Sequence, residues 1–392
     1  MSHVVVVGAS LAGFRAAETL RAEGFDGELT IIGSERHLPY DRPPLSKDFL
    51  LGKVEANQLG LCDDAIRDAL GARWLLGRSA TALTAGAVHL DSGEATEPAD
   101  GVVLTTGARA RQLMSDGLDG VHTLRTLDDA VALRADLATA SRIVIVGAGF
   151  IGTEVASTAV SLGKHVTVLE AQPQPFRNQL GPLCGALLCR TLTEHGVDLR
   201  VGAGVAEILG GDRVSGLALT DGTRIAADLV LVGVGAVPNT EWLTTSGVEC
   251  DNGVLTDEWG RTNLPRVVAA GDVARYRRGA GHVRVEHWTN ARDMPVIASR
   301  ALLAALSGTE TLGEPHDQAP YFWSEQCDRR IQLAGRIRPE QPIEVVDGAF
   351  EDGRFVAVQY HERAPSAVVG WDMPREFTRY RRQNDAALRA TW

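Results

Sequence analysis

The chain has 392 residues, of which 44% are hydrophobic and 23% charged, and its formal net charge at pH 7 is -11. This length favours two or three domains, because a single core stops growing beyond about 250–300 residues. The negative charge argues against general nucleic-acid binding, which depends on clustered cations.

No apolar run approaches the roughly 18 residues that a membrane-spanning helix needs. The N-terminus also lacks the cationic start and cleavage site of a secretory signal. The five cysteines are scattered without a C-x-x-C pair. Cys184 and Cys189 are five apart on a predicted helix, where side chains diverge, so we expect no redox disulfide there. We therefore expect free thiols in a cytoplasmic protein with no metal site and no membrane contact.

The first predicted unit spans residues 3–35. A β-branched run at 4–7 predicts a parallel strand buried on both faces. A glycine-rich turn, a helix over 13–23 and a strand at 29–32 follow, and an acidic residue comes 22 positions after the last glycine of the turn. This order is the dinucleotide-binding fingerprint, with a serine in place of the middle glycine. The predicted cofactor contacts are Gly8, Ser10, Leu11, Ala12, Gly13 and Glu35.

The second predicted unit repeats this order about 140 residues later. A strand at 143–146 precedes a turn with all three glycines, a helix follows through 162, and a strand at 165–169 ends on an acidic residue. A lone G-x-G-x-x-G is weak, but here its strand–turn–helix context is present and repeats the first unit. The predicted nucleotide contacts are Gly147, Gly149, Phe150, Ile151, Gly152 and Glu170.

Glu170 also bears on the choice of nicotinamide cofactor. A carboxylate at this position bonds the ribose diol and repels a 2′-phosphate, whereas proteins that bind the phosphate place an arginine nearby. The nearest cation is Arg177, seven residues later. The sequence therefore favours NADH over NADPH.

Further segments occur in the order found in one known family. They cover 40–47, 105–108, 233–239, 270–272, 286–291 and 321–326. On these segments the chain resembles, essentially end to end, the FAD-dependent, NADH-linked ferredoxin reductases that serve oxygenases, the putidaredoxin reductase-like group of the glutathione-reductase-like flavoproteins. The chain departs from the group at Ser10, and at Gln174 and Asn178, where relatives often carry arginines.

The resemblance implies roles for individual residues. Arg42 helps to hold the FAD phosphates, and Lys47 reaches the flavin, where a fixed cation stabilises the charge that hydride transfer adds. Glu154 projects from the first turn of the second unit's helix and pairs with Lys47; alternatively, it is an ordinary carboxylate favoured by the helix dipole. Asp272 bonds the ribityl chain. The remaining implied cofactor contacts are Thr106, Gly107, Gly235, Gly271, Glu286, His287, Trp288 and Trp323.

The predicted fold class is α/β, with two Rossmann-like dinucleotide-binding domains and a smaller α+β C-terminal domain. The NAD domain, 110–234, is inserted in the FAD domain, 1–109 and 235–312, and the C-terminal domain covers 313–392. Alternating residues at 355–360 indicate an antiparallel sheet in the last of these.

The predicted activity is hydride transfer from NADH to FAD, followed by two single-electron transfers to a small iron-sulfur ferredoxin that feeds an oxygenase. No cysteine lies near 45–47, which excludes the cysteine relays of related disulfide reductases and peroxidases. A rubredoxin partner is the nearest alternative, and a slow-turnover flavin redox sensor resembling apoptosis-inducing factor is another. We expect a monomer or weak homodimer, with arginine runs at 275–278, 329–330 and 379–382 as candidate docking sites for an acidic ferredoxin.

Overall fold

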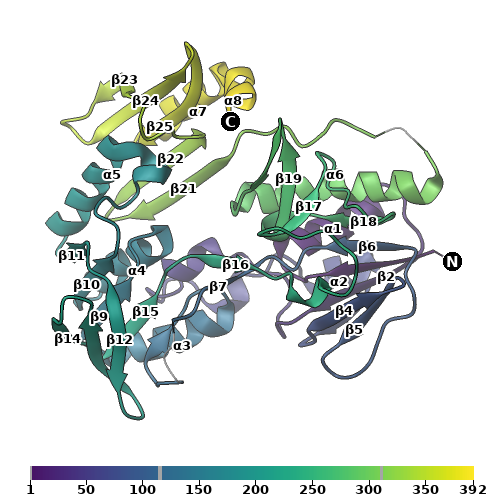
Figure 1. Cartoon of the computed structure of the whole chain (residues 1–392), viewed down its shortest axis with the longest axis horizontal. Helices are drawn as coiled ribbons and strands as arrows, with labels where there is room; N and C mark the ends of the chain where they lie inside the picture. Colours follow the sequence, from purple (N-terminus) through teal and green to yellow (C-terminus); the bar gives the residue numbers. More distant parts are fainter. Residues whose placement is uncertain (1, 114–116, 310–311) are drawn as a thin grey trace. The chain divides into compact units, whose positions relative to one another are not determined.

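The computed structural model describes residues 2–113, 117–309 and 312–392 (Figure 1). The chain forms two compact units. Unit 1 comprises Met1–Asp41, Asn57–Arg109 and Val237–Gln318, and unit 2 comprises Arg42–Ala56, Ala110–Ala236 and Ala319–Trp392. In the described part of the chain, no helix has the length and apolar character required to cross a membrane.

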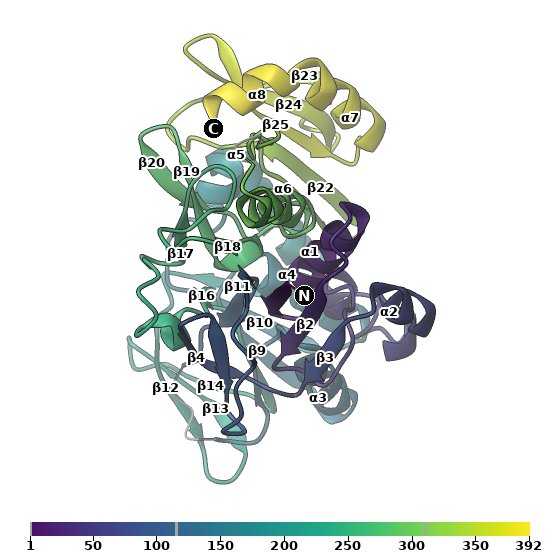
Figure 2. The ribbon, with the colours of Figure 1, turned by 90° about the vertical axis from the view of Figure 1, so that its right-hand side faces the viewer.

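Unit 1 is built on a five-stranded parallel sheet with the order β18-β6-β1-β2-β3. The central strand β1 (His3–Val7) is buried along its whole length, as its run of four valines predicts. Helices α1 (Leu11–Ala22) and α6 (Trp288–Ser307) pack against each other and are seen in Figure 2 beside this sheet. The other strands of the sheet are β2 (Glu28–Gly33), β3 (Arg73–Leu76), β6 (Gly101–Leu104) and β18 (Val267–Ala269).

Smaller elements complete unit 1. A three-stranded sheet has the order β17-β19-β20, and β4 pairs with β5. Short 3-10 turns lie at η2 (Ala56–Gln58), η3 (Glu241–Leu243) and η4 (Gly271–Val273). The remaining elements are α2 (Asp64–Leu70), β4 (Ala80–Thr84), β5 (Ala87–Leu90), β17 (Val254–Thr256), β19 (Ala274–Arg278) and β20 (Gly281–Arg284). The strands β7 (Ala108–Ala110) and β16 (Ala236–Pro238) include the residues at which the chain passes from one unit to the other.

The first sheet of unit 2 repeats the sheet of unit 1. Its order is β11-β10-β9-β15-β8, all parallel, so β9 occupies the place of β1, β10 that of β2 and β15 that of β6. This correspondence confirms the internal repeat that the sequence predicts. Its strands and helices are β8 (Val121–His122), α3 (Leu127–Thr139), β9 (Arg142–Val146), α4 (Phe150–Ser161), β10 (His165–Glu170), α5 (Arg177–Glu194), β11 (Asp198–Val201) and β15 (Leu229–Val232).

An antiparallel sheet covers one side of this second repeat. Its strands, in the order β12-β13-β14, share a hydrophobic core with β9 and β15, in which Val144, Leu217 and Val230 are almost fully buried. The strands are β12 (Val205–Gly210), β13 (Val214–Leu219) and β14 (Arg224–Ala226).

The C-terminal part of unit 2 is an antiparallel sheet with the order β21-β22-β25-β24-β23. Helices α7 and α8 pack on it through Phe377 and Leu388, which are buried with Val356, Val358 and Val368. The elements are β21 (Tyr321–Gln326), β22 (Arg329–Gly335), β23 (Ile343–Ala349), β24 (Arg354–His361), β25 (Ala364–Trp371), α7 (Pro374–Gln383) and α8 (Asp385–Thr391).

The predicted fold class is confirmed: two Rossmann-like parallel-sheet units are present, the second inserted into the first, with an antiparallel sheet at the C-terminus. The segment Arg42–Ala56, which contains the 3-10 turn η1 (Pro43–Ser46), groups with unit 2 although it directly follows the first nucleotide fingerprint. The boundaries of three separate domains stay a prediction.

Candidate functional site: two glycine-rich turns and a buried lysine–glutamate pair

The glycine-rich turn of unit 1 is fixed by close backbone packing. Gly8 has φ +120°, and a Cβ there would lie 2.1 Å from the carbonyl oxygen of Thr105, at the end of β6. A Cβ at Gly13 would lie 1.7 Å from the carbonyl oxygen of Gly8. Only glycine fits at both positions, so the turn brings the start of α1 against the ends of β1 and β6.

The turn of unit 2 has the same geometry. A Cβ at Gly147 would lie 2.4 Å from the carbonyl oxygen of Gly233, which follows β15, and one at Gly152 would lie 2.4 Å from the oxygen of Gly147. A Cβ at Gly149, by contrast, would meet nothing closer than the Gly233 oxygen at 4.0 Å. The middle position therefore faces open space, which explains why the first copy can carry Ser10 there.

These turns fit the phosphates of a dinucleotide. Each lies at the N-terminus of a 12-residue helix, where backbone N–H groups and the helix dipole favour an anion. Gly149 is the N-cap of α4 and has no side chain to occupy the N–H groups of the first turn. Leu11 and Ala12 begin α1 at the equivalent place in unit 1, two residues earlier than the predicted helix start.

The acidic residues that follow the second strands lie at the same sheet edge as the turns. The carboxylate of Glu170, at the end of β10, accepts hydrogen bonds from the backbone N–H groups of Ala148 at 2.9 Å and Gln172 at 2.8 Å. Glu35 follows β2 and accepts a hydrogen bond from the Tyr40 hydroxyl. Arg177 is bonded to Gln174 and to Glu340, at 2.9 and 2.7 Å. This arrangement is consistent with the predicted preference for NADH.

The glycine–aspartate turn of unit 1 lies against the start of α1. Gly271 has φ +74°, and a Cβ there would lie 2.9 Å from the Cβ of Ala12. Asp272 is 9% exposed in the turn η4, which directly follows β18 and its link residue Ala270. Because β18, β6 and β1 are parallel, Asp272 lies along the same sheet edge as the glycine-rich turn.

Three predicted cofactor contacts lie at or just before the start of α6. His287 is its N-cap, and desolvation lowers the pKa of this imidazole to about 4, so the ring is neutral at physiological pH. The indole Nε1 of Trp288 donates a 2.7 Å hydrogen bond to Asp41, and the Arg292 guanidinium lies 5.3 Å from the ring centroid. Glu286 is paired with Arg284.

Thr106 and Asn239, which lie near the points where the chain leaves unit 1 and returns to it, are joined by two hydrogen bonds. The Thr106 hydroxyl donates to the Asn239 carbonyl at 2.9 Å, and the Asn239 amide donates back to the Thr106 carbonyl at 2.8 Å. The Asn239 backbone N–H donates a hydrogen bond to the carbonyl of Gly107. Gly107 and Gly235, one near each of these two points of the chain, have positive φ.

The structure brings Lys47 and Glu154 together within unit 2. The Lys47 Nζ lies 3.0 Å from the Glu154 Oε2, and Glu154 is only 4% exposed. Glu154 is the fifth residue of α4, so the expectation that it projects from the first turn is wrong, and no acidic residue lies in that turn. The alternative of a carboxylate favoured by the helix dipole fails for the same reason.

Arg42 and Trp323 also lie in unit 2. Arg42 donates a hydrogen bond to the carbonyl of Arg125. Trp323, on β21, stacks on Tyr321 with ring centroids 5.9 Å apart, while Phe322 on the opposite face of the strand contacts Phe150 at 4.7 Å. Phe150 and the half-exposed Ile151 thus begin α4 beside the C-terminal sheet.

Sequence reasoning predicted Lys47 as a partner of Glu154 but missed its two hydroxyl partners. Ser46 and Ser324 both donate hydrogen bonds to its carboxylate, and Gln326 bonds Ser324. Each lies in or next to a segment that carries the family resemblance. Serine and glutamine are common on surfaces, however, and nothing in their spacing indicates that they converge on one carboxylate.

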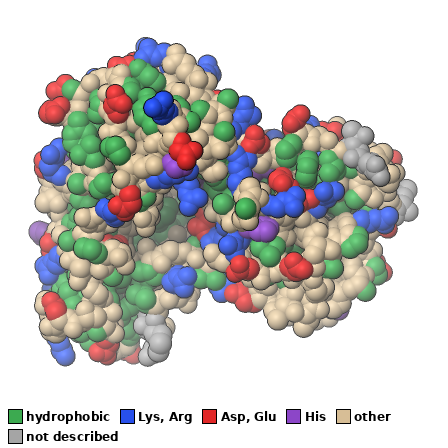
Figure 3. Space-filling model, turned by 45° about the horizontal axis from the view of Figure 1, so that its top comes forward, with side chains coloured by type: hydrophobic (Ala, Val, Ile, Leu, Met, Phe, Trp, Pro, Cys, Tyr) green, Lys and Arg blue, Asp and Glu red, His purple; other side chains and the backbone are tan. Residues whose placement is uncertain are grey.

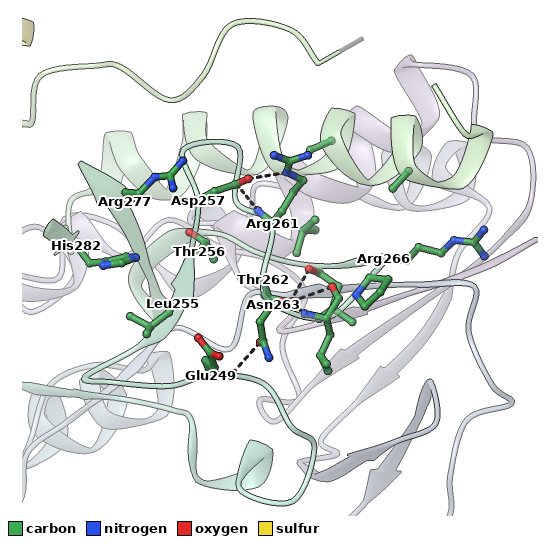
Figure 4. A pocket seen from close by; sticks show the side chains of 16 residues that line it. Glu249, Leu255, Thr256, Asp257, Arg261, Thr262, Asn263, Arg266, Arg277 and His282 are labelled. Carbon is green, nitrogen blue, oxygen red and sulfur yellow. Dashed lines mark hydrogen bonds and ion pairs between the residues drawn. The ribbon is translucent and has the colours of Figure 1, made fainter. Parts of the chain in front are cut away.

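A surface pocket of about 680 Å³ lies elsewhere in unit 1 (Figure 4). Arg261, Arg266, Arg277 and His282 line it, together with Asp257. Its wall includes Val267, the first residue of β18, so it lies at the amino end of the parallel strands. No predicted cofactor contact lines this pocket, although Arg277 belongs to the candidate docking run at 275–278. Dinucleotides bind such sheets at the carboxyl ends of the strands.

Residues 2–294 match a family model described as pyridine nucleotide-disulphide oxidoreductase, and residues 321–391 match one described as reductase C-terminal. The chain belongs to the pyridine nucleotide-disulphide oxidoreductase family. The family uses FAD and NAD(H), the two dinucleotides that the repeated turns fit, so the resemblance seen in the sequence is confirmed.

Several members of this family are similar over almost their whole length. The ferredoxin reductase component of chlorobenzene dioxygenase from Cupriavidus sp. (strain PS12) is 40% identical over 382 residues, which cover 96% of this chain and 90% of that relative. Putidaredoxin reductase from Pseudomonas putida is 35% identical, with 96% and 90% covered. The crystal structure of the covalent putidaredoxin reductase–putidaredoxin complex matches with a TM-score of 0.91 at 31% identity, covering 98% of this chain and 93% of that one.

This member of the family lacks the disulfide that the family name mentions. All five cysteines are free. Burial raises the pKa of Cys184 to about 12 and that of Cys189 to about 11, which disfavours the reactive thiolate. Cys62, the cysteine nearest in sequence to Lys47, is buried, and desolvation raises the pKa of its thiol. Burial also raises the pKa of the Cys327 thiol, next to Gln326, so these protonated thiols do not favour a cysteine relay.

Alanine substitutions at Gly152 and Gly149 should affect stability and NADH binding differently, because only Gly152 is packed closely against backbone. Gly152→Ala forces a Cβ against backbone, so we expect destabilisation by about 1–3 kcal/mol and a lower melting temperature. In Gly149→Ala the new Cβ makes only an ordinary contact, 4.0 Å from the Gly233 oxygen, so we expect an unchanged melting temperature. NADH binding should be about tenfold weaker, because the methyl group occupies the approach of the phosphates. Differential scanning fluorimetry and NADH titration measure both; equal stability losses would contradict this division.

Proposed function

We propose that the chain is an NADH-dependent flavoprotein reductase that passes electrons from NADH through FAD to a small iron-sulfur ferredoxin, which feeds an oxygenase. The observation that carries this proposal is the buried Lys47–Glu154 pair at 3.0 Å in a chain whose relatives are ferredoxin reductases of dioxygenase systems. The structurally similar putidaredoxin reductase was captured with its ferredoxin-type partner, putidaredoxin.

The proposed cofactor sites follow the repeated sheets. FAD binds along the edge of unit 1 that carries Gly8, Ser10, Glu35 and Asp272, and NADH binds at the turn of unit 2 with Glu170 on its ribose. When bound, FAD accepts two electrons from NADH and can release them singly. The protein's contribution is to bind both dinucleotides, exclude water and place charge.

Lys47 is the proposed source of that charge. Reduction adds electrons to the flavin, and a fixed ammonium lowers the free energy of the product when it lies close by. The side chains of Lys47 and Glu154 are only 16% and 5% exposed, so an unpaired charge on either would be costly. Their ion pair avoids that cost. The remaining site residues are proposed to hold the cofactors in the roles that the family resemblance implies.

The proposed location is the cytoplasm. Its support is the state of the cysteines, which are all free, as expected in a reducing compartment.

Anaerobic stopped-flow absorbance tests the proposed function. The purified protein should carry flavin, which NADH bleaches at least tenfold faster than NADPH at equal concentration, because Glu170 repels a 2′-phosphate. Addition of an oxidised two-iron ferredoxin should then restore the flavin absorbance rapidly.

The outcomes separate the alternatives. Protein without flavin would overturn the proposal entirely. Flavin that bleaches with NADH but is not reoxidised by ferredoxin would move the partner to rubredoxin, quinone or oxygen. Slow bleaching with a long-lived charge-transfer band would instead indicate a redox sensor.

The candidate docking arginines differ in how far their charge is compensated. Arg329 pairs with Asp372 at 2.9 Å and Arg330 with Glu325 at 3.1 Å. The runs at 275–278 and 379–382 contain similar ion pairs, with Asp251, Glu258, Asp317 and Asp347. Basic and acidic side chains accordingly lie close to one another over the face drawn in Figure 3.

Arg381 is different because its guanidinium lies 4.3 Å from the ring centroid of Tyr321, which carries no charge. It neighbours Arg382 at the end of α7. We therefore propose this end of α7 as the stronger electrostatic attraction for an acidic ferredoxin.

Charge reversal compares the two arginine pairs directly. Arg381→Glu with Arg382→Glu should raise the KM for ferredoxin about tenfold at low salt, while reduction of a small dye by NADH stays unchanged. Arg329→Glu with Arg330→Glu should have a smaller effect, since acidic partners already compensate these charges. Equal KM values for the first variant and the unaltered protein would remove α7 from the docking site.

A further inference from the structure

The carboxylate of Glu154 has two hydroxyl partners in addition to Lys47. The Ser46 hydroxyl donates to Oε2 at 2.5 Å, and the Ser324 hydroxyl donates to Oε1 at 2.6 Å. All three side chains are enclosed: Glu154 is 4% exposed, Ser46 3% and Ser324 0%. Hydrogen bonds to a charged group in such surroundings are short and about twice as strong as neutral ones.

The direction of the Ser324 hydrogen bond is fixed by a second contact. The Gln326 amide Nε2 donates to the Ser324 oxygen at 2.9 Å, so the hydroxyl oxygen is already an acceptor and its single proton points to Glu154. The backbone of Ser46 is held by the Thr158 hydroxyl, which donates to the Ser46 carbonyl at 2.9 Å. The Ser324 hydroxyl is therefore oriented by a second side chain, and Ser46 is fixed through its backbone.

The three groups come from separate segments of unit 2. Ser46 ends the 3-10 turn η1, Glu154 lies on α4, and Ser324 lies on β21, the first strand of the segment that matches the reductase C-terminal model. A second bond joins the same elements, because the backbone N–H of Cys327 donates to the Ser157 hydroxyl at 2.7 Å. The C-terminal sheet thus reaches the lysine–glutamate pair through one serine.

The two hydroxyls and the Lys47 ammonium share one carboxylate, that of Glu154. A buried carboxylate without the hydroxyls would have the ammonium as its main partner, and the lysine would stay directed at it. With two hydroxyl donors, the negative charge is shared. Among the described residues, the Lys47 Nζ contacts only Glu154 at 3.0 Å and the Pro43 carbonyl at a weak 3.4 Å, so at least one of its three N–H bonds stays available.

We propose that Ser46 and Ser324 are positioning residues that compensate the Glu154 carboxylate and thereby leave the Lys47 ammonium able to stabilise the reduced flavin. This inference rests on the proposed function, in which Lys47 acts on the flavin. It makes the C-terminal sheet part of the control of the flavin potential, through Ser324, in addition to any part in contacting a partner protein.

Removal of either hydroxyl tests the inference. In Ser324→Ala and Ser46→Ala, Glu154 should hold Lys47 more tightly, so the two-electron midpoint potential of the flavin should fall. The rate constant for flavin reduction at saturating NADH should fall about tenfold, as expected for a lost hydrogen bond to a charged group. The dissociation constant for NADH should change less than twofold.

Ser366→Ala is the matched control. Ser366 is also a fully buried serine on a strand of the C-terminal sheet, but its hydroxyl donates to the Gln359 carbonyl at 3.2 Å and not to the Glu154 cluster. Its removal should lower the melting temperature slightly and leave the midpoint potential unchanged. Ser324→Thr, which retains the hydroxyl, should recover most of the potential of the unaltered protein.

A wild-type midpoint potential in both Ser324→Ala and Ser46→Ala would overturn the inference, as would an equal shift in Ser366→Ala. If Ser324→Ala does not retain flavin, Ser46→Ala decides alone. The potential is measured by photoreduction against reference dyes and needs neither NADH nor ferredoxin. Failure of the proposed function would instead appear as a lack of NADH or ferredoxin turnover in the unaltered protein.

Discussion

The buried carboxylate of Glu154 is the constraint on which the site depends. A charge this enclosed is costly unless cations and hydrogen-bond donors surround it, and its removal from water is offset only when every partner is well placed. Lys47, Ser46 and Ser324 meet this requirement at 2.5–3.0 Å. Ser46 and Lys47 are neighbours in the chain, whereas Glu154 and Ser324 lie on two distant segments. The segment 42–56 therefore packs with unit 2, although its neighbours in sequence belong to unit 1.

Each copy of the parallel sheet holds a glycine-rich turn in the same geometry. In both copies the first glycine packs against the backbone that follows a neighbouring strand, and the third packs against the carbonyl oxygen of the first. The middle position of the second copy is open. This division of roles explains why one copy tolerates Ser10 and why the two copies can hold related ligands. Parallel pairing also aligns the carboxyl ends of the strands, so that Asp272 and the turn after β1 share one edge.

Much of the two nucleotide-binding units was predictable, because the motifs that indicate them are short and local in the sequence. The valine run of β1, the glycines that follow it and the acidic residue after β2 indicate a strand, a turn and a ribose contact without knowledge of the rest of the chain. The family resemblance then placed Lys47 beside Glu154. The cofactor roles of individual residues remain predictions.

What escaped prediction depends on tertiary packing. Glu154 was expected in the first turn of its helix because the turn's end cannot be located to within a residue from the sequence. By contrast, the antiparallel sheet packed by helices that residues 355–360 suggest is present, because β24 lies in such a sheet and α7 and α8 pack on it through Phe377 and Leu388. The convergence of Ser46 and Ser324 on one carboxylate has no sequence signal, because it requires three distant segments to meet.

A double-mutant cycle on Lys47 and Glu154 tests the central claim most directly. The rate constant for flavin reduction at saturating NADH would be measured for Lys47→Met, Glu154→Gln and the double variant. We expect strong coupling, because the two groups act as one unit. Each single variant should be slow. The rate constant of the double variant should be at least tenfold higher than the value obtained by multiplying the two single losses. Losses that simply multiply would contradict the claim that this buried pair acts together in the transfer of electrons.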